Sequence, residues 1–318
     1  MLYLLRLSVA SEKNTMFFNT RRLIIANTLI VLFLATSVTT VRAEGSLLRG
    51  FDVPATTPED SGNRSVAPSL YWPIGIAFDG TNLYYSQPCL CTRDIFHTTT
   101  NGVLLNTLHE LSQAGALAWD GTNLWVGIFS STTCASNTSG CSLIFEVNPS
   151  TGNIIKTVDV SAIFAADGLG GCNVIDGLSF DTATGTLWVS PDIGCAIPIT
   201  NNPCGIGFVY NVDQSGNLIK RLQLPFGVAG DAKVGNYLYL VTCGSSATNG
   251  QRVVNKTTLD GTLVSSFVTV SVSGFKESHG EGIAFDPTSF APNCAVWVVQ
   301  SYNIPFDASL AAYQIDCP

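Results

Sequence analysis

The chain has 318 residues, a formal net charge of -8, and only 12% charged residues against 46% hydrophobic ones. This is the composition of a globular protein without a basic surface, which argues against nucleic acid as a partner.

The N-terminal region has the parts of a secretory signal peptide. Two arginines precede an apolar run that begins at Leu23, and Val41 and Ala43 have the spacing of a small-residue cleavage site. We therefore predict a signal peptide over residues 1–43. Translation from Met16 is an alternative start, which would make residues 1–15 an upstream extension.

After cleavage, residues 44–318 would form one domain without a stable membrane span. An uncleaved anchor is the alternative, but the apolar run is shorter than the roughly 20 residues that a spanning helix needs. We expect a secreted, periplasmic or cell-surface protein.

One strand–turn–strand unit recurs five times along the mature chain. Its copies start at Pro73, Gly115, Asp176, Phe226 and Glu281. The first strand of each copy alternates small and large residues, as in GIAF and ALAW, which suits a place where neighbouring sheets converge. The second strand is aromatic and β-branched, as in LYYS and LWVG.

A second strand–turn–strand unit lies between these hairpins, as in LIFEVNPSTGNIIKTVDV. Four antiparallel strands at a period of roughly 40 to 60 residues are typical of propeller blades. The fifth repeat is one strand short, and Ser46 to Pro54 resembles the missing outer strand. We predict an all-β, five-bladed β-propeller closed by this N-terminal strand, with six blades as the alternative.

The repeat wording, P-x-G-I-A-F-D-G-T-N-L and then V-x-P-S-T-G-x-I, resembles the YVTN and NHL-type repeats of bacterial propellers, including the virginiamycin B lyase superfamily. The Glu-Gly pair at Glu281 is similar to the start of gluconolactonase-like propellers. The resemblance covers most of the mature chain. It implies the fold, but these families include lyases, lactonases and ligand readers.

Topology sorts the connections onto two faces. Long segments between second and third strands or between blades share one face, here called the loop face, and short turns share the other, the hairpin face. Most of the ten cysteines fall in loop-face segments, which favours a disulfide framework in an exported chain. These eight are Cys89, Cys91, Cys134, Cys141, Cys172, Cys195, Cys204 and Cys243.

Loop membership pairs Cys134 with Cys141 and Cys195 with Cys204. Cys294 and Cys317 lie on the hairpin face at adjacent strand ends, where a bond would staple the closing blade. The pairing of Cys89, Cys91, Cys172 and Cys243 stays open among three arrangements.

Two carboxylates precede the glycine that opens an inner strand, Asp176 in the third repeat and Glu281 in the fifth. At the loop-face mouth of the channel they would share a funnel with Asp192 and His279. Such oxygen ligands suit calcium or magnesium, with His279 as acid or base. By resemblance, Glu281 takes the metal-ligand role of the gluconolactonase-like Glu. The alternative is that both carboxylates only accept backbone hydrogen bonds.

A second acidic set has a structural explanation. Hairpin turns favour aspartate, and the set lies on the hairpin face. Its members are Asp79, Asp120, Asp181, Asp231 and Asp286. The sequon at Asn255 is expected on an exposed surface.

The sequence therefore supports three hypotheses and leaves catalysis undecided. The first is a propeller that binds a small molecule, glycan or protein through a disulfide-pinned loop face, without catalysis. The second is a metal-dependent lyase or lactonase-type enzyme at the channel mouth. The third is a cell-surface structural protein.

Overall fold

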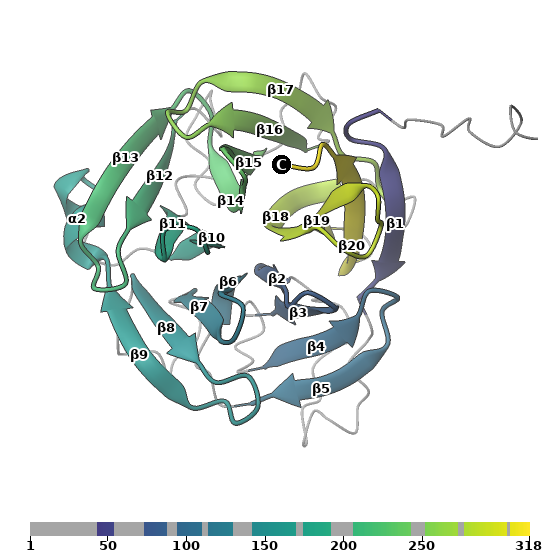
Figure 1. The fold of residues 1–318 in the computed structure, drawn as a ribbon, viewed down its shortest axis with the longest axis horizontal. Coiled ribbons are helices and arrows are strands. Elements are labelled where there is room, and N and C mark those ends of the chain that lie inside the picture. Colours follow the sequence, from purple (N-terminus) through teal and green to yellow (C-terminus); the bar gives the residue numbers. More distant parts are fainter. Residues whose placement is uncertain are drawn as a thin grey trace, which may run out of the picture. The chain divides into compact units, whose positions relative to one another are not determined.

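The computed structural model describes residues 43–53, 73–87, 94–109, 114–129, 142–169, 174–191, 206–242, 252–272, 277–303 and 306–318. These residues form five four-stranded antiparallel sheets arranged around a central axis (Figure 1). The fold is thus the predicted five-bladed β-propeller. The predicted leader lies outside the described residues.

Each blade runs from an inner strand at the axis to an outer strand at the rim. Blade 1 consists of β2 (Ile76–Phe78), β3 (Asn82–Ser86), β4 (Ile95–Thr99) and β5 (Leu104–Leu108). Blade 2 consists of β6 (Ala114–Trp119), β7 (Leu124–Ile128), β8 (Leu143–Val147) and β9 (Ile154–Asp159). Blade 3 consists of β10 (Ile175–Asp181), β11 (Thr186–Pro191), β12 (Gly207–Val212) and β13 (Leu218–Leu224). Blade 4 consists of β14 (Val228–Val234), β15 (Tyr237–Thr242), β16 (Val253–Thr258) and β17 (Leu263–Val268). Blade 5 consists of β18 (Glu277–Asp286), β19 (Cys294–Asn303), β20 (Phe306–Ile315) and β1 (Leu47–Asp52).

One short helix, α2 (Ser161–Ala166), follows blade 2 and was not predicted from the sequence. Its six residues are too few to show a helical period in the sequence. Phe164 anchors it with a fully buried ring, which packs tilted against Tyr210 of blade 3 at a centroid distance of 5.4 Å. No described helix has the length and apolar character that a membrane crossing requires.

The inner strands converge at the loop-face end of the axis, where five glycines form a ring. These glycines are Gly75, Gly115, Gly177, Gly230 and Gly282. A Cβ on Gly75 would lie 2.1 Å from the Gly115 carbonyl oxygen, and one on Gly282 would lie 2.5 Å from the Ile74 carbonyl oxygen. Backbone thus meets backbone from blade to blade, including across the closure, and a side chain would not fit.

The N-terminal strand closes the ring as predicted. β1 pairs antiparallel with β20, with Phe51 opposite Leu310, so blade 5 combines both ends of the described domain. Glu44 extends the seam, because its carboxylate accepts hydrogen bonds from Tyr239 at 2.7 Å and Ser265 at 2.9 Å in blade 4. The closing strand is therefore held by two blades.

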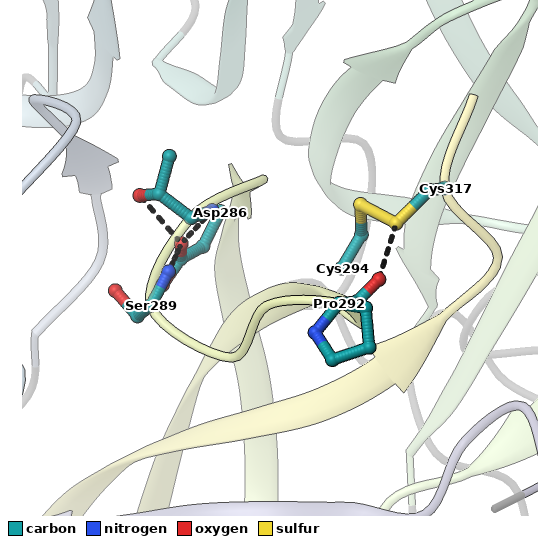
Figure 2. The surroundings of a disulfide bond; sticks show 6 residues. Asp286, Ser289, Pro292, Cys294 and Cys317 are labelled. Atoms are coloured by element: carbon teal, nitrogen blue, oxygen red, sulfur yellow. Dashed lines mark hydrogen bonds between the residues drawn. A yellow bond between two sulfur atoms is a disulfide. The ribbon is translucent and has the colours of Figure 1, made fainter. Parts of the chain in front are cut away.

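The disulfide between Cys294 and Cys317 is present where the sequence placed it (Figure 2). It joins the start of β19 to the segment after β20, with the two Cα atoms 5.1 Å apart. In the same turn Asp286 accepts the Ser289 amide at 2.9 Å (Figure 2). The bond thereby fixes the last residues of the chain beside the β18–β19 hairpin.

We predict that Gly75→Ala lowers the free energy of unfolding by about 3 kcal/mol or more, because its methyl group has no room against the Gly115 carbonyl. Gly80→Ala is the matched control: Gly80 has a positive φ of 98° but nothing within 4 Å of the added Cβ. It should lose only about 1 kcal/mol from backbone strain. Urea unfolding followed by tryptophan fluorescence measures both, and equal losses would contradict the packing explanation.

Candidate functional site: the two ends of the central channel

At the loop-face end, the inner strands bulge at the position where the sequence placed its two carboxylates. The β10–β11 register shifts between Ile175 and Gly177, and the β18–β19 register shifts between Gly280 and Ile283. A bulge turns one side chain away from the regular alternation. Asp176 and Glu281 occupy these bulges and are 4% and 6% exposed.

The equivalent residue of blade 4 is Ala229 rather than Phe226, since its bulge lies between Val228 and Gly230. Between the blades of Asp176 and Glu281, blade 4 therefore has no carboxylate at the bulge position. Neither residue is without partners in the protein.

The structure does not test the other two members of the predicted ion site. His279 pairs with Ser301 in the β18–β19 ladder, but its side chain lies outside the description, as does the whole of Asp192. Within the described part of the chain, no group of three or more His, Cys, Asp or Glu residues is placed to hold a metal ion. The expected cysteine pairs Cys134–Cys141 and Cys195–Cys204 also lie outside it.

At the hairpin-face end the channel widens into a cavity of about 360 Å³ that all five blades line. Its walls begin within two positions of the glycine ring. Sequence reasoning placed the functional mouth at the opposite end and missed this cavity.

Strand register identifies one equivalent cavity position in every blade. Each residue there pairs with the Leu or Val that precedes an aromatic residue in the second strand, for example Phe78 with Leu83 and Lys233 with Leu238. The five residues are Phe78, Trp119, Phe180, Lys233 and Phe285, and all line the cavity. Four aromatic rings and one lysine therefore surround the opening.

Lys233 forms an ion pair with Asp181, whose Oδ2 lies 3.2 Å from Nζ, and both side chains are at most 10% exposed. Nζ also donates to the Gly235 carbonyl. The opposite charges of the two side chains offset each other.

Two positions before Lys233, blade 4 carries Asp231 where the other blades have Ile76, Leu117, Leu178 and Ile283. Asp231 was expected in a hairpin turn, but it lies inside β14 and is fully buried. The β14–β15 turn is shorter than the others, so the aspartate falls deeper in the strand. Three other members of the set do stabilise hairpin turns. Each carboxylate accepts hydrogen bonds from two backbone N–H groups, in Asp79, Asp120 and Asp286.

The carboxyl of Asp231 lies against blade 3. It accepts hydrogen bonds from Ser179 at 2.7 Å and Ser190 at 3.0 Å, and Ser179 in turn accepts the Lys233 amide at 3.1 Å. We call Ser179, Ser190, Asp231 and the Asp181–Lys233 pair the polar seam. It replaces the apolar packing of the other blade interfaces, and such departures from a repeat occur at functional or strained sites.

Burial raises the pKa of Asp231 to about 7, and the two serine hydrogen bonds only partly oppose this effect.

The Asn255 sequon also departs from expectation, since Asn255 lies in β16 and is 8% exposed.

No protein-family model matches the sequence, and no characterised protein matches it either. Solved structures with a similar course of the chain include BamB from Moraxella catarrhalis, at 11% identity over 76% of this chain and 71% of that one, with a TM-score of 0.35. Another is Sqt1 of Saccharomyces cerevisiae, at 12% identity over 85% of this chain and 60% of that one, with a TM-score of 0.35. A third is the Swd1 propeller domain of Myceliophteria thermophila, at 8% identity over 76% of this chain and 83% of that one, with a TM-score of 0.38.

Likenesses this distant do not indicate an activity. The fold assignment rests on the sheet topology, and the resemblance to YVTN and NHL-type repeats extends no further than the propeller architecture.

We predict that Asp231→Asn makes the protein more stable than the wild type at pH 8. At pH 5 this gain in the free energy of unfolding should be much smaller. The folded carboxyl holds its proton up to about pH 7, whereas the unfolded one loses it near 3.8, so the wild type loses stability as pH rises between these values. The full interval corresponds to on the order of 4 kcal/mol.

Denaturant unfolding of both proteins at several pH values measures this difference. Subtracting the two curves removes the contribution of every other carboxylate. A difference that is constant from pH 5 to pH 8 would contradict a protonated Asp231.

Proposed function

We propose that this protein is an exported β-propeller that binds a glycan, small molecule or protein partner through its loop face. The observation that carries the proposal is that the connections between strands are longer on the loop face than on the hairpin face. On the hairpin face β14 and β15 are joined through Gly235 and Asn236 alone, whereas the loop-face connections of blades 2 and 3 span residues 129–142 and 192–206. Long connections on a rigid scaffold are the usual place for recognition.

The cysteines support the same face. Eight of the ten cysteines of the chain fall in its segments, and disulfides would hold such segments in one arrangement. The leader sequence and the Cys294–Cys317 bond both agree with export into an oxidising compartment.

The test is a glycan array probed with the mature protein and two matched variants. The first variant replaces residues 130–141 by a glycine–serine linker of equal length. The second makes the same replacement of residues 213–217 in the β12–β13 turn of the hairpin face.

We expect the loop-face variant to lose at least tenfold in affinity for the glycans retained by the wild type, and the turn variant to match the wild type. Loss in the turn variant alone would contradict the choice of face. The absence of any retained glycan would exclude this ligand class, and a peptide array would then be probed with the same three proteins.

A metal-dependent lyase or lactonase-type enzyme is the second candidate, favoured by one observation. Asp176 and Glu281 occupy matching bulges at one end of the channel, and both are nearly buried. In this proposal they hold a calcium or magnesium ion, Asp192 completes the ligands, and His279 acts as acid or base.

Calorimetric titration of the metal-stripped protein with Ca²⁺ and Mg²⁺ tests this candidate. One ion per chain should bind to the wild type and to Asp286→Asn, a turn aspartate far along β18 from the bulge, but not to Glu281→Gln. If the wild type takes up no ion, or if both variants behave alike, the metal-site proposal is wrong.

A further inference from the structure

The cavity at the hairpin-face end of the channel has the size and lining of a small-molecule site. Its volume of about 360 Å³ falls within the range of known ligand pockets. Its walls are mostly apolar, with a few polar groups gathered on one side, at blades 3 and 4.

The opening favours a flat, apolar ligand. Trp119, Phe180 and Phe285 are partly exposed. The residues two positions before them in each strand are buried, namely Leu117, Leu178 and Ile283. Aromatic rings bury large areas and gain further from stacked or edge-to-face contacts with another ring. Each inner strand is also the edge of its sheet, so its backbone groups on the channel side have no strand partner.

The charges favour an uncharged ligand. Lys233 and Asp181 neutralise each other across 3.2 Å, so a charged ligand would lose its hydration without gaining a counterion. Within the described residues the Lys233 ammonium has two acceptors, Asp181 and the Gly235 carbonyl. An ammonium has three N–H groups, so one is left to donate to a ligand acceptor.

We propose that this cavity binds a small uncharged aromatic molecule that carries a carbonyl or similar acceptor, with its rings among the aromatic side chains and its acceptor at Lys233. The site lies on the face opposite the loop face and does not depend on the function proposed for that face.

The experiment uses an acylated dimethylaminonaphthalene, a neutral aromatic ketone whose emission shifts to the blue in apolar surroundings. It is titrated into the oxidised mature protein and two tryptophan variants of the exposed β10–β11 turn. Ala183→Trp fills the opening, because Ala183 lines the cavity. Thr184→Trp adds the same ring at the next exposed residue, which does not line it.

We expect one probe per chain, at least tenfold weaker binding in Ala183→Trp, and unchanged binding in Thr184→Trp. Thr182→Trp, also exposed and lining the cavity, replaces Ala183→Trp if that variant does not fold. Absence of a blue-shifted complex, several probes per chain, or equal affinity in a folded cavity-filling variant would overturn the proposal.

The acceptor contact has its own comparison. The parent dimethylaminonaphthalene, which lacks the carbonyl, should bind the wild type about tenfold more weakly than the ketone. This difference should vanish in Lys233→Met, which keeps an unbranched side chain but removes its donors. An equal preference for the ketone in both proteins would show that Lys233 is not its partner.

Discussion

The close approach of the five inner strands at one end of the axis is the constraint on which the rest of the structure depends. Gly177 approaches Asp231, Gly230 approaches the Glu281 carbonyl, and Gly282 completes the circle to blade 1. Closure of the ring therefore requires a residue without a side chain at the same level in every blade. The bulges that hold Asp176 and Glu281 lie immediately before Gly177 and Gly282.

This constraint also explains why the two ends of the channel differ. The inner strands touch at the loop-face end and diverge toward the hairpin face. The space between them therefore accommodates larger side chains toward the hairpin face. In four blades an alanine lies one position before the aromatic residue or lysine at the opening: Ala77, Ala118, Ala232 and Ala284. Blade 3 has Ser179 at this level, and the polar seam begins from it.

The architecture could be predicted because its signals are local and repeated. The repeated hairpin sequence predicts five blades. The missing outer strand of the fifth repeat predicts closure by β1, and the positions of Cys294 and Cys317 predict one disulfide. The hairpins depend on turn chemistry and strand alternation within about twenty residues. The closure by β1 follows from counting strands, because the fifth repeat lacks one and the N-terminal segment supplies it.

The channel could not be predicted in the same way, because its residues come one from each blade. Aligning the repeats on their turn aspartates placed Asp231 in a turn and put Phe226 at the position that Ala229 occupies. The cause is that the β14–β15 turn is shorter than the others. Aligning them on the Leu or Val that precedes an aromatic residue in the second strand, as in Leu83 and Leu238, would have shown Lys233 among the aromatic residues. The depth of burial of Asp176 and Glu281 depends on bulges, which the sequence does not mark.

Amide hydrogen exchange at the glycine ring tests the central claim most directly. The Gly75 amide donates to Ser86 at 2.9 Å, and the Gly282 amide donates across the closure to the Ile74 carbonyl at 2.7 Å. If the blades are locked together at this level, these amides exchange only through global unfolding, as slowly as the slowest core amides. Exchange of the Gly282 amide as fast as that of the exposed turns would mean that the ring opens at the closure, and would contradict the account.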